Sequence, residues 1–412
     1  MIAVLFGTYN SAHAANVLLA GDLERAGLEV RSCHEPLWEE TRDKHDAYFA
    51  PLALIRLGAR WLRAAARLGR RYRGASPAPD LVVAGFNGQL DVVLARVIAR
   101  RRPLLFAPLV TVTETLIDDR ATYRADSLAA RLLALLDRVT LGLADRIVID
   151  TAAHREYLCE RLGVPHERIL VQYLGAEDTF APATSPVDRP AGAVSSTAAR
   201  SVTTASCREE MGPSAVAGDP SERARPLRVL FYCTYVPLHG ARVVAAALGQ
   251  LSPRDGIAVE MVGTGPERAA CEAIVRDLPH VRLRDWIPYQ ELPARIRAAD
   301  VVLGIFGSSI KARMVVPNKV YQAAQVGRAI VTADTPAIRE VFRPGESIWT
   351  IDPEPSALAG ALRRLARETD LRERLGREAR ADVLRAAGPA VRAARLAEVA
   401  DVLVHGARGR AG

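Results

Sequence analysis

Two lysines offer the clearest chemistry in this chain. Lysine occurs only three times among 55 basic residues, yet Lys311 and Lys319 both lie in the stretch SSIKARMVVPNKVYQAAQVGRAIVTADTPAIREV, residues 308–341. Where arginine is so strongly preferred, a retained lysine indicates a place that requires a compact ammonium group. Together with Arg313, the two lysines predict an anion site, and a phosphate is the obvious ligand. The alternative for Lys319 is a solvated lysine at the start of a helix.

The elements around Lys319 would place it at a helix N-terminus. Residues 319–325 read as a helix that follows Pro317 and Asn318 and ends at Gly327, and an apolar strand comes next. A helix N-terminus carries free backbone N–H groups and the positive end of the helix dipole. Both features strengthen the prediction of an anion site.

Short apolar runs alternate with helical segments along the chain. Strands are expected at residues 2–6, 28–32, 80–84, 103–107, 146–149 and 168–173, separated by helices at 11–27, 51–72, 88–101, 127–144 and 151–162. A second series of strands follows at 228–232, 259–263, 281–285, 301–306, 329–333 and 347–351, and helices at 355–367, 370–386 and beyond Pro389 end the chain. This alternation predicts an α/β fold with parallel sheets covered on both faces.

A segment rich in Ala, Ser, Thr, Pro and Gly divides the two series. We therefore expect a Rossmann-like domain over residues 1–181, a flexible linker over 182–226, a second Rossmann-like domain over 227–388, and a C-terminal helix and tail over 389–412. Two such sheets bind ligands in the cleft between their carboxyl ends. Neither first strand is followed by the glycine pattern of a nicotinamide-binding turn.

Five ordered motifs resemble the GT-B glycosyltransferases, specifically the retaining, nucleotide-sugar-dependent group of bacterial polysaccharide and glycolipid synthesis. They are LGAEDTFAP (174–182), VLFYCTYVPLHG (229–240), VGTGPER (262–268), DWIPYQELPARIRAADVVL (285–303) and PNKVYQAAQVGRAIVTADTPAIREV (317–341). The resemblance implies two Rossmann-like domains facing across a cleft, the first holding the acceptor and the second the donor. It also implies transfer of a sugar, with retention, from a nucleotide diphosphate sugar to a hydroxyl of a saccharide or lipid-linked acceptor. The nucleotide sugar is then a co-substrate, and no further cofactor is expected.

The resemblance places the donor site in the second domain. It implies that Lys319 and its neighbours hold the diphosphate, and that two backbone loops line the nucleotide base pocket. The donor-binding residues expected on this basis are Thr234, His239, Gly240, Gly263, Trp286, Ile287, Pro288, Gly304, Phe306, Gly307, Arg313, Asn318 and Gln322.

The chain departs from the family at charged positions. The family's paired glutamates would fall at Met314 and Gln322; an amide can still bond ribose hydroxyls, but a thioether cannot replace a carboxylate. The family's phosphate-binding arginine and lysine would fall at Thr234 and His239, so Lys311, Arg313 and Lys319 have to supply the positive charge. Fixed cations stabilise the charge that grows on a diphosphate leaving group. With no DxD-like metal clamp in the sequence, metal-independent catalysis is expected.

The first domain offers polar loops at its predicted strand ends. Acceptor contacts are expected from Gly7, Thr8, Tyr9 and Asn87. Glu114, Asp118 and Asp119 form the densest acidic group, and one of them could bind the acceptor or take its proton. The alternatives are ordinary helix-capping acids and, for His13 and His154, structural histidines.

Composition argues against nucleic-acid binding and leaves contact with a membrane open. The net charge is +8, and residues 51–79 hold seven arginines and no acid. Five arginines within residues 52–73 recur every three or four positions, at 56, 60, 63, 67 and 70. This spacing predicts a basic amphipathic helix that either contacts an anionic membrane or forms a solvated face. Nucleic acid is not expected, because aromatic residues are only 5% of the chain and do not alternate with the basic residues.

Cellular location is predicted from what the sequence lacks. Five scattered cysteines without a CxxC pair indicate a reducing compartment, and the first residues, MIAVLFGTYN, have no basic segment of a signal peptide. No apolar run is long enough to span a membrane. A cytoplasmic enzyme is the expectation, and peripheral contact with the inner face of the membrane is left open by the basic helix. The two other functions left open are a nucleotide-sugar epimerase on the same fold and an inactive nucleotide-sugar-binding or scaffold protein.

Overall fold

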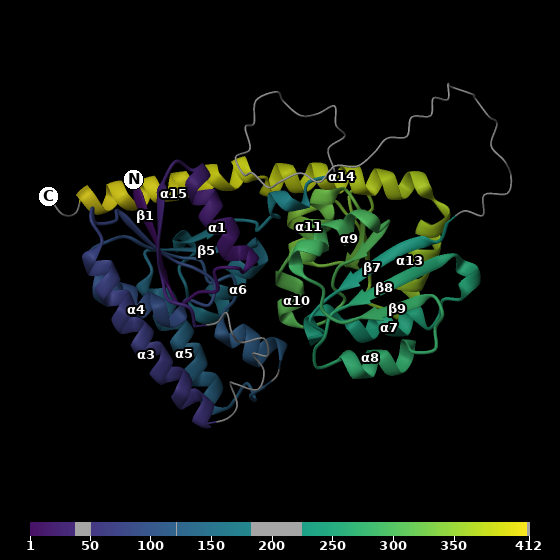
Figure 1. The fold of residues 1–412 in the computed structure, drawn as a ribbon, viewed down its shortest axis with the longest axis horizontal. Helices are drawn as coiled ribbons and strands as arrows, with labels where there is room; N and C mark the ends of the chain where they lie inside the picture. Colours follow the sequence, from purple (N-terminus) through teal and green to yellow (C-terminus); the bar gives the residue numbers. More distant parts are fainter. Residues whose placement is uncertain (38–50, 121, 183–224, 410–412) are drawn as a thin grey trace, which may run out of the picture.

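Two parallel sheets form two lobes that face each other (Figure 1). The computed structural model describes residues 1–37, 51–120, 122–182 and 225–409, so nearly all of the expected linker (182–226) and the last residues, 410–412, lie outside the described residues. Each sheet has six strands, all hydrogen-bonded in parallel, with helices on its faces. The predicted fold class, two Rossmann-like domains facing across a cleft, is confirmed.

The first sheet has the strand order β2-β1-β3-β4-β5-β6. Its strands are β1 (Ile2–Gly7), β2 (Glu29–His34), β3 (Leu81–Ala84), β4 (Leu104–Phe106), β5 (Arg146–Ile149) and β6 (Ile169–Val171). The helices between them are α1 (Ala14–Arg25), α3 (Pro51–Gly74), α4 (Gln89–Ala99), a π-helical turn η1 (Glu114–Asp119), α5 (Leu128–Leu143) and α6 (Ala152–Leu162). Buried aliphatic and aromatic residues fill both faces, which explains why these strands read as continuous apolar runs.

The second sheet has the order β12-β11-β10-β7-β8-β9. Its strands are β7 (Leu227–Tyr232), β8 (Ile257–Val262), β9 (Val281–Arg284), β10 (Val301–Leu303), β11 (Ala329–Ala333) and β12 (Trp349–Ile351). Its helices are α7 (Ala241–Leu248), α8 (Arg268–Val275), α9 (Leu292–Ala298), α10 (Ile310–Met314), α11 (Asn318–Val326), α12 (Pro336–Val341), α13 (Pro355–Arg367) and α14 (Thr369–Ala387). Short 3₁₀ turns precede α7 at Pro237–His239 and α9 at Tyr289–Glu291.

The C-terminal helix α15 (Pro389–Gly409) crosses from the second lobe back to the first. In Figure 1 it continues the line of α14 and lies beside α1, against which it packs. Leu396 and Leu403 of α15 are buried in the core of the first sheet. The guanidinium of Arg392 is buried and donates to both carboxylate oxygens of Asp22 on α1, at 2.7 and 3.0 Å. Packing also occurs in the other direction, since Phe180, from the first half of the chain, is buried in the core of the second sheet.

A polar interface joins the lobes where β5 ends. The Thr151 hydroxyl caps the first turn of α6 and also donates to the backbone carbonyl of Met314 in the other lobe. The Glu340 carboxylate, on α12, accepts the backbone N–H groups of Ala152 and Ala153, each at 2.7 Å. A carboxylate at a helix N-terminus is favourable because it meets free N–H groups and the positive end of the dipole. These contacts hold the second lobe over the carboxyl end of the first sheet.

Candidate functional site: a cavity between the two sheets

A cavity of about 1040 Å³ lies between the carboxyl ends of the two sheets. From the first lobe it is bordered by residues that follow β1, β3, β4 and β5 and by parts of α3, α4 and α5; from the second, by residues that follow β7 and β9 and by α11. This is the edge at which doubly wound sheets bind ligands. The expected cleft therefore exists in the structure as a cavity with walls from both domains.

Lys319 lies at the N-terminus of α11 and lines this cavity. Its side chain is only 5% exposed, and within the described residues no carboxylate forms an ion pair with it. Its ammonium instead faces the rings of Phe231 and Tyr232, with 4.6 and 5.7 Å between Nζ and the ring centroids. Burial lowers the pKa of Lys319 from 10.5 to about 8. A buried cation without a counter-charge is costly, and an anionic ligand would recover that cost.

His239 and Thr234 stand beside Lys319. The Lys319 ammonium lies 3.4 Å from Nδ1 of His239, and Nε2 of His239 lies 3.1 Å from the hydroxyl of Thr234. Because an ammonium only donates, Nδ1 must accept, which leaves the proton on Nε2 facing Thr234. Burial and the neighbouring lysine hold the pKa of His239 well below 6.5, in agreement with a neutral ring. The two residues at the family's arginine and lysine positions therefore add no positive charge here.

Gln322 lies one turn further along α11 and is already bonded at both ends of its amide. Its oxygen accepts from the Tyr232 hydroxyl at 2.8 Å, and its nitrogen donates to the Tyr289 hydroxyl at 2.9 Å. Tyr289 in turn donates to Glu177 at 2.6 Å. Gln322 borders the cavity, but these bonds leave only one amide hydrogen and part of its oxygen for the ribose contact expected of it. Met314, at the other glutamate position, is buried.

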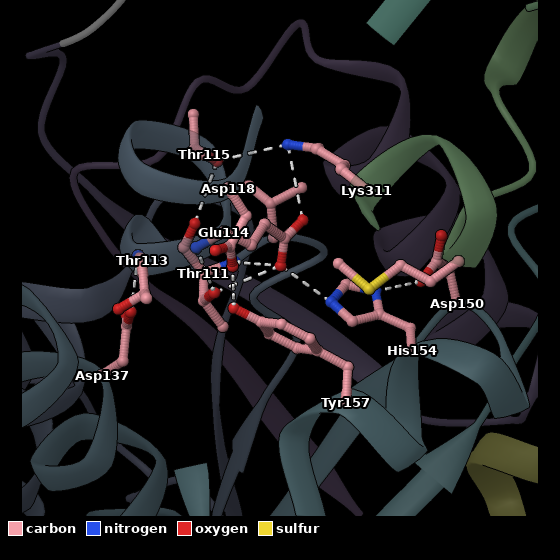
Figure 2. Close-up of polar contacts among 12 residues, drawn as sticks. Thr111, Thr113, Glu114, Thr115, Asp118, Asp137, Asp150, His154, Tyr157 and Lys311 are labelled. Carbon is pink, nitrogen blue, oxygen red and sulfur yellow. Dashed lines mark hydrogen bonds and ion pairs between the residues drawn. The ribbon is translucent and has the colours of Figure 1, made fainter. Parts of the chain in front are cut away.

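Lys311 makes a different contact from the one the sequence predicts. Its ammonium reaches across to the first lobe, 3.4 Å from Oε1 of Glu114 and 3.2 Å from the hydroxyl of Thr115 (Figure 2). Lys311 borders the cavity, yet its charge is already neutralised. Arg313, the third expected cation, is exposed and does not border the cavity. Of the three cations expected to hold the diphosphate, only Lys319 reaches the cavity without a paired carboxylate.

Glu114 is the centre of a buried charged cluster that also contains His154, Asp150 and Lys311 (Figure 2). Nε2 of His154 lies 2.8 Å from Glu114, and Nδ1 of His154 lies 2.7 Å from Asp150. Burial alone would raise the pKa of Glu114, but the neighbouring His154 and Lys311 cations lower it well below 4.5. Burial alone would lower the pKa of His154, but the two carboxylates raise it to about 10. The cluster therefore consists of two anions and two cations in contact.

The other two acids expected at the acceptor are held by side chains. Asp118 accepts from the Tyr157 hydroxyl at 2.6 Å, and Asp119 accepts from Ser309 of the second lobe at 3.2 Å. Burial raises the pKa of Asp119, against the effects of Lys311 and Ser309. Neither acid nor Glu114 borders the cavity, whereas Asp150 does. Asp150 is not among the residues singled out from the sequence. Its position directly after β5, at the carboxyl end of a parallel strand, is the sequence feature that would have identified it as a cavity residue.

The expected acceptor loop after β1 is only partly at the cavity. Thr8 and Asn87 border it, whereas Gly7 and Tyr9 do not. A β-carbon at Gly7, whose φ is +138°, would lie 2.3 Å from the carboxylate of Asp91. That carboxylate accepts the backbone N–H of Thr8 at 2.7 Å, and burial raises the pKa of Asp91 to about 6. Gly7 thus allows Asp91 to hold the loop in place.

The glycines of the second domain allow backbone segments to approach one another. A β-carbon at Gly240, whose φ is +61°, would lie 2.3 Å from the backbone of Phe306, and one at Gly307 would lie 2.5 Å from the carbonyl of Leu238. Gly263 similarly faces the carbonyl of Cys233. None of Gly240, Gly263, Gly304, Phe306 and Gly307 borders the cavity. Because residues 304–307 turn back against residues 237–240, β10 ends at Leu303 and not at residue 306 as expected.

The remaining donor residues lie along the second lobe's side of the cavity. Trp286 and Ile287 border it, as does Asn318 at the start of α11; Pro288 does not. Trp286 is 61% exposed, so its ring is available to a ligand. The described residues contain no group of three His, Cys, Asp or Glu side chains placed to hold a metal ion, and metal independence stays a prediction.

The basic helix α3 presents its arginines outward. Arg56, Arg63 and Arg70 are exposed, whereas Leu68 is fully buried and Trp61 borders the cavity. Two of its other arginines are not free, because Arg67 and Arg71 pair with the Glu35 carboxylate at 2.7 and 3.1 Å. Among the residues that the structure describes, no helix is long and apolar enough to cross a membrane.

Several solved structures share the fold of this chain. The chain is 16% identical to HepE of Anabaena, solved with UDP and glucose, with a TM-score of 0.61 over 97% of this chain and 99% of that one. It is 16% identical to the sucrose-phosphate synthase of Thermosynechococcus elongatus, with a TM-score of 0.69 over 98% and 99%. A glycosyltransferase of Rickettsia africae is 12% identical, with a TM-score of 0.61 over 98% of both chains. The architecture of two facing Rossmann-like domains is therefore the GT-B fold.

Family models match each half of the chain separately. The model of Glycosyltransferase Family 4 matches residues 16–179, and the model described as glycosyl transferase-like matches residues 242–398. No curated protein sequence matches the chain. The protein is a GT-B glycosyltransferase, with a family 4 domain in its N-terminal half and a glycosyl transferase-like domain in its C-terminal half.

Proposed function

We propose that this enzyme transfers a sugar from a nucleoside diphosphate sugar to a hydroxyl of a saccharide or lipid-linked acceptor, with retention and without a metal ion. The observation that carries the proposal is Lys319, a buried cation at a helix N-terminus in the interdomain cavity, with no carboxylate paired to it among the described residues. A diphosphate there would meet the ammonium and the free N–H groups of α11.

The placement of Lys319 also suits catalysis. Negative charge grows on the diphosphate as the bond to the sugar breaks, so a fixed cation aimed at it stabilises the transition state more than the ground state. Because Lys319 is buried, the interaction is screened less than it would be in water. HepE, whose fold this chain shares, has been solved with UDP-glucose, which supports a nucleotide sugar as donor. The ammonium would supply the charge for which other enzymes use a metal ion.

Retention is supported by how the acids are held. Glu114 is neutralised by His154 and Lys311, and Asp118 and Asp119 point to partners outside the cavity lining. The described residues thus offer Asp150 as the carboxylate that borders the cavity, already bonded to His154 through one oxygen. We infer that the leaving phosphate itself receives the acceptor proton, which is the route that resembling retaining enzymes are thought to use.

Membrane contact is the second part of the proposal. The exposed arginines of α3, within residues 52–73, would lie on anionic headgroups, each adding about 1 kcal/mol near the surface. This would place the enzyme at the cytoplasmic face of a membrane, where lipid-linked acceptors are found. Flotation with phosphatidylglycerol vesicles tests the contact, and wild-type protein that stays at the bottom of the gradient contradicts it.

Calorimetry with UDP and GDP tests the donor site. The variant Lys319→Met should weaken binding of the preferred nucleotide by about 1.5–3 kcal/mol, the range for a hydrogen bond to a charged group. Arg313→Met is the matched control, because Arg313 is exposed outside the cavity and its loss should leave affinity unchanged. Equal affinity of wild type and Lys319→Met would defeat the assignment.

Donor turnover distinguishes this function from its rivals. A glycosyltransferase consumes the donor sugar only when an acceptor is present, and the product sugar keeps its anomeric configuration by NMR. Conversion of the donor without any acceptor would identify an epimerase. Nucleotide binding without turnover would indicate an inactive binding protein, the alternative that Met314 and Gln322 favour because they replace carboxylates.

A further inference from the structure

The wall that the first lobe contributes to the cavity is mainly apolar. Its side chains come from α3, η1 and α5, and include Leu57, Trp61, Leu116, Leu133 and Leu136. The opposite wall has apolar residues as well, but it also carries Thr234, His239, Lys319 and Gln322. The donor is proposed to lie against the second lobe, so the leucines and Trp61 of the first lobe are left for another ligand. Apolar surface of this extent in a cavity favours a ligand with an apolar part, because binding removes that surface from water.

A second cation lies on the first lobe's side of the same cavity. Arg120, at the end of η1, borders the cavity. Its Nε is buried without a hydrogen-bond partner, and within the described chain no carboxylate forms an ion pair with it. Among the described residues three long cations border the cavity; Lys311 is paired with Glu114, which leaves Lys319 and Arg120. A buried unpaired donor is rare and costly, and an anion would satisfy it.

The apolar wall is continuous with an exposed apolar stripe on the same helix. Leu128, Leu132, Leu135 and Val139 of α5 are spaced by four, three and four residues, so they share one face, and between 46% and 71% of each is exposed. Leu136, one turn after Leu132, and Leu133 border the cavity. Helix α4 packs against both α5 and the arginine-bearing α3. The exposed stripe of α5 could contact lipid at the protein surface, and the leucines of α5 that border the cavity could contact an apolar chain within it.

We infer that the acceptor is an anionic amphiphile, a lipid phosphate whose apolar chain lies between α3 and α5 and whose phosphate binds Arg120. This inference rests on the proposed function and specifies its acceptor. The chain would be buried against leucines and Trp61, and the phosphate would accept a charged hydrogen bond from the guanidinium. The acceptor hydroxyl would then lie beside the donor sugar, on the side of the cavity toward Lys319.

Binding of small amphiphiles to the full-length enzyme tests the inference without knowledge of the natural acceptor. The probes are n-decyl phosphate below its critical micelle concentration, n-decyl glucoside and inorganic phosphate, measured by calorimetry in the presence of saturating UDP. We expect n-decyl phosphate to bind at least about tenfold more tightly than either other probe, since each lacks one of the two interactions. Equal affinity for n-decyl phosphate and inorganic phosphate would show that the apolar wall binds no chain, and would overturn the inference.

Four variants locate the site. Arg120→Gln should weaken n-decyl phosphate about tenfold and leave n-decyl glucoside unchanged. Leu133→Gln should weaken both decyl probes, whereas its neighbour Leu132→Gln, on the exposed side of α5, should weaken neither. Leu116→Trp, which fills the space with an apolar side chain, serves as the second pocket variant if Leu133→Gln is unstable. All variants should keep wild-type affinity for UDP.

The same measurements separate this inference from the proposed function. If wild type binds UDP with the dependence on Lys319 described above but binds no decyl probe, the acceptor inference fails and the donor assignment stands. If Arg120→Gln weakens UDP and not n-decyl phosphate, Arg120 belongs to the donor site and the inference is overturned. If UDP does not bind at all, the proposed function fails whatever the decyl probes do.

Discussion

The two domains hold their buried charges differently. In the first domain Glu114 and Asp150 both contact His154, and Lys311 of the second lobe pairs with Glu114. In the second domain Lys319 is buried with no carboxylate paired to it in the described structure. The pKa values differ accordingly. For Glu114 and His154, the combined effect of the neighbouring charges on the pKa is larger than the effect of burial, so both side chains keep their charges. For Lys319 burial dominates, and its pKa falls to about 8.

The contrast separates a buried charge that is paired within the protein from a buried charge that has no carboxylate partner in the described residues, and only the second is a candidate for binding an anion. Lys311 and Lys319 both lie in the short stretch 308–341, and the spacing of residues there does not tell which of them is paired. A charge that is satisfied within the protein contributes to holding the two lobes together. A charge that is left unsatisfied costs stability in the free enzyme, and a bound anion would remove that cost.

The largest expected effect comes from removing Glu114 from the buried charged cluster. Glu114→Gln leaves the His154 imidazolium with one carboxylate and Lys311 with none, so we expect a loss of about 3–5 kcal/mol in the free energy of unfolding. Lys319→Met is the comparison, since it removes a buried unpaired charge and should leave stability unchanged or higher. Urea unfolding followed by circular dichroism measures both. Equal destabilisation by the two substitutions would show that the two sites do not differ in this way.

The pH dependence of stability should have opposite signs at the two sites. The folded pKa of His154, about 10, lies above its unfolded value of 6.5, so its contribution is complete below pH 6.5 and is lost as the pH rises toward 10. The folded pKa of Lys319, about 8, lies below 10.5, so its penalty is complete below pH 8 and disappears as the pH rises toward 10.5.

Variants sharpen this second prediction. Between pH 8 and 10, His154→Gln should make the free energy of unfolding fall less with pH than in wild type, and Lys319→Met should make it fall more, by up to about 1.4 kcal/mol per pH unit in each case. Urea unfolding at several pH values gives the slopes. Slopes that change in the same direction for both variants would contradict the pKa assignments.

Nucleotide binding should be coupled to a proton at Lys319. A diphosphate beside the ammonium raises its pKa, so UDP binding above pH 8 should take up as much as about one proton, and binding at pH 6 should take up almost none from this group. Calorimetry in buffers of different ionisation enthalpy measures the proton count. Lys319→Met should abolish the difference between the two pH values, and an unchanged count in this variant would place the titrating group elsewhere.

The smallest expected effect concerns the polar chain beside Gln322. Tyr289→Phe removes the hydrogen bond to Glu177 and the one from Gln322, and we expect a loss of about 1 kcal/mol because Tyr289 is partly exposed. Tyr123→Phe is a suitable control, since no hydrogen bond of the Tyr123 hydroxyl is found in the described residues. Thermal unfolding compares the two, and a larger loss in the control would contradict the network.

Most of the architecture could be predicted from the sequence because buried parallel strands and amphipathic helices follow local patterns. Strands β5 and β11 and helix α13 begin and end where their residues indicate. The π-helical turn η1 and the short α10 could not be predicted, because their form depends on Asp137 accepting backbone N–H groups of residues 112 and 113 and on contacts between the lobes. The crossing of α15 to the first lobe likewise depends on Asp22, which is 370 positions away in sequence.

The sequence by itself determined the fold class and the family resemblance, and it predicted an anion site near α11, since residue types and short-range spacing carry that information. Only the tertiary structure decided which of the two lysines lacks a carboxylate partner among the described residues. Lys311 and Lys319 differ in what lies opposite them, a carboxylate of the other lobe in one case and two aromatic rings and a neutral histidine in the other. The free energy of a buried charge depends on its nearest partners in space, and these come from parts of the chain that the local sequence does not specify.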